Sequence, residues 1–200
     1  PTPLSSFSKE KFEILFYMTK FVLHGGFNKE IGFIKDEFFL EMFKDAPDNT
    51  KVLLVYFAES DEMKPLRIEQ GKNQFEKNKG SKHIEIKIAS PASFIEECRW
   101  ADLVYFSGGR TMRLMEAIQK YTNLEEVFKD KTIGGDSAGA NFLAQYFYSK
   151  GSQEVGEGLK ILPFKILVHY EDGMPNPLEN IKPELETVFL REYETKVFHK

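Results

Sequence analysis

The chain has 200 residues, of which 42% are hydrophobic and 29% are charged, and its net charge is -4 with a pI near 5.7. This length and composition exclude a mostly disordered chain and leave room for one domain with a substantial core. Proteins that bind nucleic acid or anionic membranes usually carry clustered positive charge, so we expect neither partner here.

Residues 1–17 hold several apolar side chains but join abruptly to a strand-like run. We expect an N-terminal extension or a leader upstream of Met18, followed by a single α/β domain over residues 18–200. No window approaches the ~20 apolar residues of a membrane span. Cys98 is the only cysteine, which fits a reducing cytoplasm. The expectation is a soluble cytoplasmic protein in which Cys98 is a half-buried thiol on a helix.

From Lys20 onward, short apolar or β-branched runs alternate with amphipathic stretches. This alternation predicts an α/β fold of the doubly wound type, a three-layer sandwich with helices on both faces of a mostly parallel central sheet. Strands are predicted at 21–24, 52–57, 83–88, 103–106, 132–134 and 166–169, and helices at 31–43, 68–79, 92–100, 111–121 and 138–148.

Polar residues that directly follow predicted strands are the candidates for a functional site. Doubly wound sheets bind ligands beyond the carboxyl ends of their strands, where the loops diverge. His24, the turn 107–110, Ser137 and His169 occupy such positions, whereas His83 opens a strand at the opposite edge and is expected on the surface.

The segment 135–139 reads Gly-Asp-Ser-Ala-Gly and matches the G-x-S-x-G pattern of a nucleophile elbow. Its glycines would let a strand turn sharply into a helix, which lifts the Ser137 hydroxyl out of the sheet. The following amide, that of Ala138, would then face the same space as a donor for an oxyanion. A glycine-rich loop that binds phosphate, or merely turns, is the alternative.

A second glycine turn, Ser107-Gly108-Gly109-Arg110, follows the preceding strand and would lie beside the elbow in a parallel sheet. The Gly109 amide could complete an oxyanion hole. The turn could equally serve to start a helix, with Thr111 as its cap.

A serine hydroxyl needs a base at neutral pH, and histidine is the commonest one. His169 ends an apolar run downstream of the serine, so we interpret it as the base, with His24 as the competitor. The acid that would orient the base is open among four carboxylates. Two lie in the Gly-rich stretch after the nucleophile helix and two directly follow the histidine: Glu154, Glu157, Glu171 and Asp172.

With these residues in place, the chain resembles the peptidase E family, the aspartyl dipeptidases, from about Thr19 to about Tyr170. Three segments match the family's motifs in the family's order. They are the glycine turn Gly108-Gly109 with Arg110 in place of the family's Asn, the elbow Ser137 to Asn141, and the pair Pro163-Phe164 and His169-Tyr170.

The resemblance implies a class I glutamine amidotransferase-like (flavodoxin-like) fold and a serine hydrolase without cofactor or metal. It implies Ser137 as nucleophile, His169 as base, and Gly109 with Ala138 as the oxyanion hole. Glu154 is the nearest counterpart of the family's acid. The implied substrate is a short peptide with an acidic N-terminal residue. Substrate binding would fall to Asn141 and to Arg110, whose guanidinium can bind a carboxylate, although an ordinary surface arginine is the alternative.

Two other functions stay open on the same fold. An amidase or esterase could use Glu171 as its acid, because His169-Tyr170-Glu171 has the His-x-Glu spacing of class I glutamine amidotransferases. A catalytically inactive binding protein could retain the pocket and form a homo-oligomer, since a fold does not by itself confer activity.

Overall fold

The computed structural model describes residues 18–27 and 37–200. The expected leader at 1–17 and the first part of the helix predicted at 31–43 therefore lie outside the described residues.

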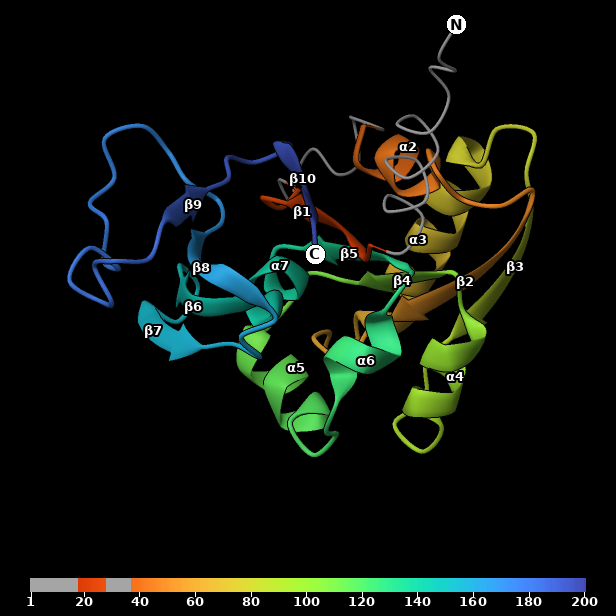
Figure 1. Cartoon of the computed structure of the whole chain (residues 1–200), viewed down its shortest axis with the longest axis horizontal. Coiled ribbons are helices and arrows are strands. Elements are labelled where there is room, and N and C mark those ends of the chain that lie inside the picture. Colours follow the sequence, from red (N-terminus) through yellow and green to blue (C-terminus); the bar gives the residue numbers. More distant parts are fainter. Residues whose placement is uncertain (1–17, 28–36) are drawn as a thin grey trace, which may run out of the picture.

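A six-stranded central sheet runs through the described part of the chain in the order β10-β1-β5-β4-β2-β3 (Figure 1). All neighbouring strands are parallel except β10, which runs antiparallel to β1. The five strands predicted between 21 and 134 are confirmed, and β10 was not predicted. Their bounds are β1 Lys20–His24, β2 Asn49–Val55, β3 His83–Ile88, β4 Leu103–Phe106, β5 Thr132–Asp136 and β10 Thr195–His199.

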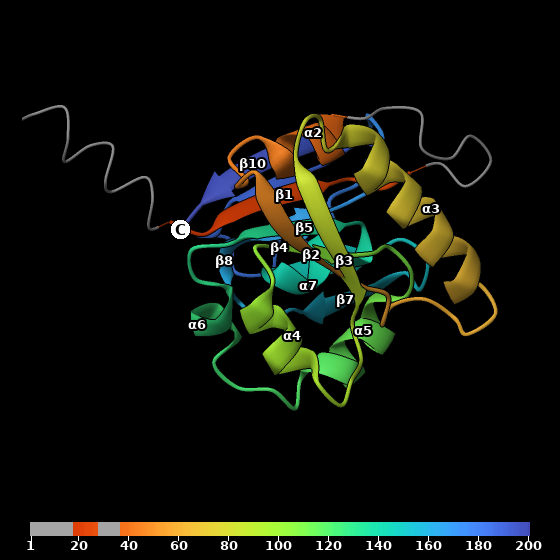
Figure 2. The ribbon, with the colours of Figure 1, turned by 90° about the vertical axis from the view of Figure 1, so that its right-hand side faces the viewer.

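Helices cover both faces of this sheet (Figure 2). On one face α2 (Glu37–Phe43) and α3 (Lys64–Asn78) pack through phenylalanine side chains. The other face carries α4 (Phe94–Trp100), α5 (Thr111–Ile118), α6 (Leu124–Phe128) and α7 (Ala138–Leu143). The doubly wound, three-layer prediction is confirmed, although α6 was not predicted.

The central strands read as continuous apolar runs because both of their faces are buried. In β1, Phe21 and Leu23 pack into the core on the α4–α7 face, while Val22 between them packs on the α2–α3 face. Full burial of one such side chain stabilises the fold by about 1.5–3 kcal/mol. These two cores fix the carboxyl ends of β1, β4 and β5 at one edge of the sheet.

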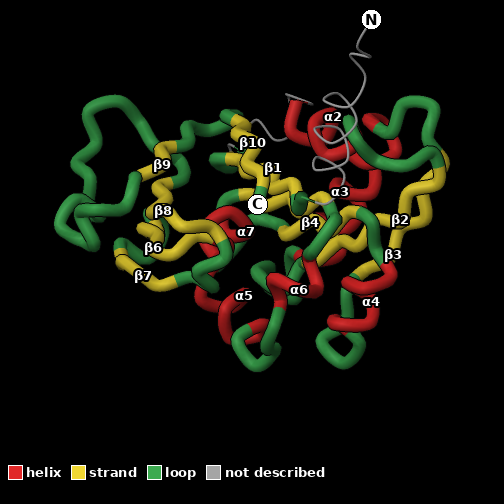
Figure 3. Tube along the Cα trace, in the orientation of Figure 1, coloured by secondary structure: helices red, strands yellow, loops and turns green. Residues whose placement is uncertain are grey.

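A second sheet, which was not predicted, lies beside the central one (Figure 3). Its order within the described residues is β7-β6-β8-β9. The strand predicted at 166–169 belongs to this sheet rather than to the central one, because it is part of β8. The bounds are β6 Ala144–Ser149, β7 Glu154–Glu157, β8 Leu162–Leu167 and β9 Thr187–Phe189.

The helix predicted at 138–148 is wrong after Leu143, where α7 ends. The chain continues directly into β6, whose aromatic residues Tyr146, Phe147 and Tyr148 pair with β7 on one side and β8 on the other. Aromatic side chains suit a pleated, half-buried surface, and here the pairing with two neighbours outweighs the helical pattern of α7.

Cys98 is wholly buried under α4 rather than half-buried as expected. Burial raises the pKa of its thiol to about 12, so the group stays protonated at neutral pH. Among the described residues, no helix combines the length and the apolar character needed to cross a membrane.

Candidate active site

Ser137 stands at the junction between β5 and α7, at the carboxyl edge of the central sheet. Its backbone has φ 47° and ψ -100°, a left-handed conformation that a non-glycine residue rarely adopts. Such a backbone costs on the order of 1–3 kcal/mol and persists only where the surrounding structure enforces it. The strand, the sharp turn and the helix together form the elbow that the sequence predicts.

The glycines of the elbow act through close packing, not through the turn itself. A Cβ at Gly135 would lie 2.4 Å from the Gly139 carbonyl oxygen, and a Cβ at Gly139 would lie 2.3 Å from that of Phe106. Neither glycine has a positive φ; the turn is made by Ser137. The expectation that the glycines supply the turn is therefore corrected: they let α7 approach β5 and β4.

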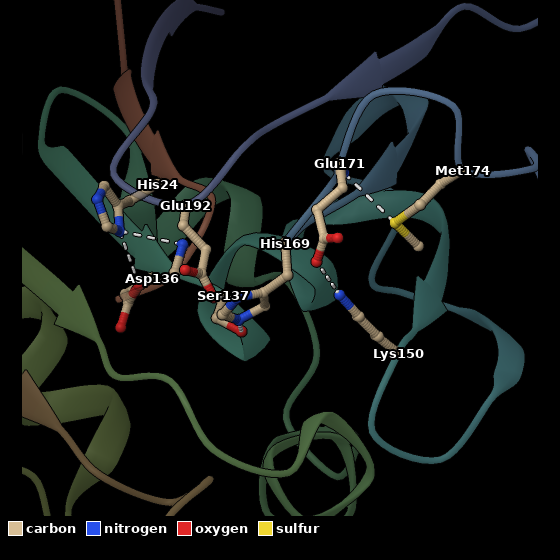
Figure 4. A network of polar contacts seen from close by, with 9 residues as sticks. His24, Asp136, Ser137, Lys150, His169, Glu171, Met174 and Glu192 are labelled. Carbon is tan, nitrogen blue, oxygen red and sulfur yellow. Dashed lines mark hydrogen bonds and ion pairs between the residues drawn. The ribbon is translucent and has the colours of Figure 1, made fainter. Parts of the chain in front are cut away.

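His169 is the second residue after β8, which belongs to the second sheet. Its side chain points toward the elbow (Figure 4). Its Nε2 lies 3.0 Å from the Ser137 Oγ. The His169 backbone is also left-handed, with φ 52°. Ser137 follows a strand of the central sheet and His169 follows a strand of the second sheet, and the two side chains are in contact. Residues with a strained backbone often cluster in this way at functional sites.

Glu192 is the functional candidate that sequence reasoning missed. Its Oε1 lies 3.1 Å from the other ring nitrogen of His169, Nδ1. A proton on Nδ1 donated to Glu192 leaves Nε2 free to accept from the Ser137 hydroxyl. Glu192 follows β9 closely in the chain, so the rule that selected the other candidates would have selected it too. The short apolar run 187–190 is the sequence signal for β9, and it is absent from the strands predicted above.

Glu154, the predicted acid, lies elsewhere. Glu154 and Glu157 open and close β7, the edge strand of the second sheet, and both are exposed. Glu157 pairs with Lys160 at 2.6 Å. In the part of the chain that the structure describes, neither carboxylate is bonded to His169.

The other two carboxylates, Glu171 and Asp172, point away from His169 although they follow it in sequence. Glu171 accepts a hydrogen bond from Lys150 at 2.6 Å, and this bond with the nearby charge lowers the pKa of Glu171 (Figure 4). Asp172 pairs with Arg191 on the surface. Neither is bonded to His169 within the described residues.

His24, the competing base, is 1% exposed and turned away from the Ser137 hydroxyl. Its Nδ1 lies 2.9 Å from Oδ1 of Asp136, and its ring packs on Phe27 with centroids 4.1 Å apart. No bond between His24 and Ser137 Oγ is found among the described residues. The link between the two is through the backbone, since the Ser137 amide donates to the His24 carbonyl at 3.0 Å.

The second glycine turn lies beside the elbow, as the sequence predicts. Gly109 has φ 131°, and a Cβ there would lie 2.6 Å from the Ala58 carbonyl oxygen. The Arg110 amide donates to that same oxygen at 2.9 Å, which holds the turn against the loop that follows β2. Within the described residues, neither the Gly109 amide nor the Ala138 amide donates to a backbone carbonyl.

The glycine turn does start a helix, since α5 begins at Thr111, but Thr111 is not its cap. The N-cap is Arg110, and Thr111 Oγ1 accepts a hydrogen bond from Nδ2 of Asn141 at 3.1 Å. Asn141 is 2% exposed, so its side chain fastens α7 to α5 at the floor of the site. The Arg110 side chain is exposed and has no recorded ion pair in the described part of the chain.

A cleft of about 820 Å³ joins these features. Its volume falls in the range of small-molecule sites, which is roughly 300–1,000 Å³. Burial raises the pKa of Tyr105 on its wall, and the nearby Asp136 adds to the shift, so the phenol is neutral. The walls come from both sheets and include Phe27, Tyr56, Glu59, Tyr105, Gly109, Arg110, Arg113, Asp136, Ser137, Asn141, Lys150 and His169.

No group of three or more His, Cys, Asp or Glu side chains within residues 18–27 and 37–200 is arranged to hold a metal ion. The chemistry available at the site is that of a serine, an imidazole, a carboxylate and backbone amides. Such a set can carry out acyl transfer.

Comparison with known proteins gives a family and a fold. Peptidase family S51 matches residues 22–196. A peptidase from an acI-B1 Actinobacterium is 19% identical, with a TM-score of 0.63 over 92% of this chain and 84% of that one. A peptidase E protein from Listeria monocytogenes EGD-e is 18% identical, with a TM-score of 0.63 over 92% and 98%. No match was found among curated proteins.

Proposed function

Because the chain belongs to peptidase family S51 and is therefore a peptidase, we propose that it hydrolyses short peptides through the triad Ser137, His169 and Glu192. Dipeptides with an acidic N-terminal residue are the proposed substrates. The observation that carries the proposal is the 3.0 Å contact between the Ser137 Oγ and the His169 Nε2, with Glu192 behind the imidazole.

The acylation step follows from this geometry. His169 Nε2 takes the proton of the Ser137 hydroxyl while Oγ forms a bond to the scissile carbonyl carbon. The carbonyl π electrons move to the oxygen, and the Gly109 and Ala138 amides stabilise the resulting oxyanion. Glu192 accepts the Nδ1–H bond and stabilises the imidazolium. His169 then gives the proton to the leaving amine as the C–N bond breaks.

Water completes the reaction at the acyl-enzyme. His169 takes a proton from the water as its oxygen bonds to the acyl carbon, and the oxyanion forms again at the same two amides. Collapse of this intermediate breaks the bond to Oγ, and His169 returns the proton to Ser137. The enzyme is regenerated, and the products are a carboxylic acid and an amine.

Arg110 supports the choice of an acidic substrate. It lies on the cleft wall next to the Gly109 amide, and its exposed guanidinium is without an ion pair in the described part of the chain. A guanidinium binds a carboxylate through two parallel hydrogen bonds. The size of the cleft supports a substrate of one or a few residues.

The test is hydrolysis of Asp-p-nitroanilide, compared with Asn-, Leu- and Ala-p-nitroanilide, by the parent protein and by Ser137→Ala. Asn-p-nitroanilide matches the shape of the Asp substrate but lacks its charge. We expect turnover of the Asp substrate and a loss of roughly 10⁴-fold or more in kcat for Ser137→Ala.

The outcomes separate the parts of the proposal. Equal turnover of all four substrates would retain the peptidase and reject acidic specificity. No turnover of any of them, with Ser137 still labelled by a fluorophosphonate, would indicate a serine hydrolase for another acyl substrate. A Ser137→Ala variant as active as the parent would reject the nucleophile.

A further inference from the structure

The turn that follows β1, His24-Gly25-Gly26, holds the backbone of all three segments of the proposed triad. The His24 carbonyl accepts the Ser137 amide at 3.0 Å, and the Gly25 carbonyl accepts the His169 amide at 2.9 Å. The Gly26 carbonyl accepts the amide of Tyr193, the residue after Glu192, at 3.0 Å. Three consecutive carbonyls thus hold segments that are far apart in the sequence.

Gly26 also lies directly against the imidazole of His169. A Cβ on Gly26 would be 2.1 Å from Cε1 and 2.3 Å from Nε2 of that ring. Contacts below 3.0 Å are essentially never seen for a real Cβ, so any larger residue would have to displace the ring. With φ at 107°, Gly26 also adopts a conformation that other residues avoid. The α-carbon of Gly26 therefore forms the surface on which the His169 ring rests.

The side chain of His24 also contacts this turn. Its Nδ1 lies 3.2 Å from the Gly26 amide nitrogen and 2.9 Å from Oδ1 of Asp136, the residue before Ser137. This group is buried and belongs to neither the base nor the acid of the proposed mechanism. It ties the support of the base to the strand that carries the nucleophile.

We propose that His24-Gly25-Gly26 is a positioning element of the active site, in which Gly26 sets the His169 ring in line with the Ser137 hydroxyl. The proposal rests on the proposed function, since it assumes that the two side chains react as a pair. A misplacement of about 1 Å in such a pair can cost about 10²-fold in rate.

The first experiment compares Gly26→Ala with Gly173→Ala. Both glycines have a positive φ, but a Cβ at Gly173 would meet nothing within 4 Å, so the control carries the backbone penalty alone. The readout is the rate at which a fluorophosphonate labels Ser137, which requires no peptide substrate. We expect a loss of about 10²-fold for Gly26→Ala and a change within about 2-fold for Gly173→Ala.

Two further readouts separate positioning from a general loss of structure. In protein labelled with ¹⁵N-histidine, Gly26→Ala should shift the ring nitrogen signals of His169, whereas Gly173→Ala should leave them in place. With Asp-p-nitroanilide, Gly26→Ala should lower kcat and leave KM within about 3-fold, because the change displaces the His169 ring and leaves Arg110, proposed to bind the substrate, in place.

A second pair of variants applies if Gly26→Ala lacks a cooperative unfolding transition. His24→Phe keeps the ring packing but removes the contacts of Nδ1, and His24→Asn restores a polar group near Asp136. We expect His24→Phe to slow labelling about 10-fold and His24→Asn to recover most of that loss.

A folded Gly26→Ala labelled as fast as the parent would overturn the positioning role and leave the proposed function intact. If Gly26→Ala does not fold, the His24 variants decide the question. Equal labelling rates of His24→Phe and His24→Asn would then overturn the positioning role. A parent protein that no fluorophosphonate labels at Ser137 would reject the proposed function instead.

Discussion

The central sheet and the second sheet contribute to the candidate site in different ways. The central sheet provides Ser137 on one continuous segment, β5 followed by α7, in which strand, turn and helix are adjacent in sequence. The second sheet provides His169 and Glu192 from the ends of two different strands, β8 and β9, and contacts the first region through the turn after β1. A local pattern thus defines the elbow that carries Ser137, whereas tertiary packing brings His169 and Glu192 to it.

This difference teaches where errors in a sequence-based site arise. The elbow could be identified because glycines at fixed spacing are needed for helix and strand to approach closely. The carboxylate beside His169 could not be identified from the sequence. Several carboxylates lie in the C-terminal part of the chain, and only the strand order of the second sheet shows that Glu192 is the one next to His169. The predictions below test the two regions against each other.

The largest effect is expected for the acid supplied by the second sheet. Glu192→Gln should lower kcat by roughly 10³-fold, because the neutral amide can neither orient the His169 tautomer nor stabilise the imidazolium. Glu154→Gln is the matched control and should stay within about 2-fold, because Glu154 is exposed on the edge strand. Steady-state kinetics of both variants is the measurement, and a loss confined to Glu154→Gln would return the role of acid to β7.

The next effect concerns packing of the elbow. Gly135→Ala should lower the free energy of unfolding by about 3 kcal/mol, because its Cβ would lie 2.4 Å from a backbone oxygen in α7. Gly151→Ala, in the β6–β7 hairpin of the second sheet, meets nothing within 4 Å and should be neutral or slightly stabilising. Urea unfolding of the two variants measures this contrast, which similar stabilities would contradict.

A smaller effect is expected for two of the cations that line the cleft, Arg110 and Lys150. Arg110→Ala should raise KM for an acidic substrate about 10-fold, because a charge-assisted carboxylate contact is lost. Lys150→Ala should change KM by less than about 2-fold, because Lys150 is already paired with Glu171 on the surface. The two KM values for Asp-p-nitroanilide give the comparison; an effect of Lys150→Ala alone would move substrate recognition to the second sheet.

The smallest effect, taken per pH unit, is alkaline destabilisation through Cys98, in the core of the central sheet. The folded protein holds the thiol proton up to a pKa of about 12, whereas the ordinary pKa is 9.0. The stabilisation is therefore present below about pH 9 and is lost, by about 1 kcal/mol per pH unit, as the pH rises toward 12.

Cys98→Ala provides the control for this slope. Its free energy of unfolding should fall less steeply than that of the parent between about pH 9 and about pH 11. Other groups that titrate in this range, such as the buried Tyr105, are common to both proteins and cancel in the difference. Parallel slopes from urea unfolding would contradict the assignment.

The sequence by itself determined the parallel strands of the central sheet and the elbow that carries Ser137. Runs such as 103–106 are apolar on both faces because both faces are covered, and this signal is contained in the segment itself. The elbow around Ser137 is also marked locally, since Gly135 packs on Gly139 four positions away, although Gly139 in turn packs on Phe106 in β4. The confirmed class I glutamine amidotransferase-like fold followed from these elements and from the resemblance built on them.

Only the tertiary structure decided the second sheet, the position of Glu192 and the contact between Gly26 and His169. The strand β6 follows α7 without a loop, and it forms because β7 and β8 pair with it. Glu192 reaches His169 because β9 lies beside β8, and Gly26 meets His169 because the segment after β8 is hydrogen-bonded to the end of β1 through Gly25. These contacts join residues far apart in the sequence, and their energies depend on partners that no local pattern contains.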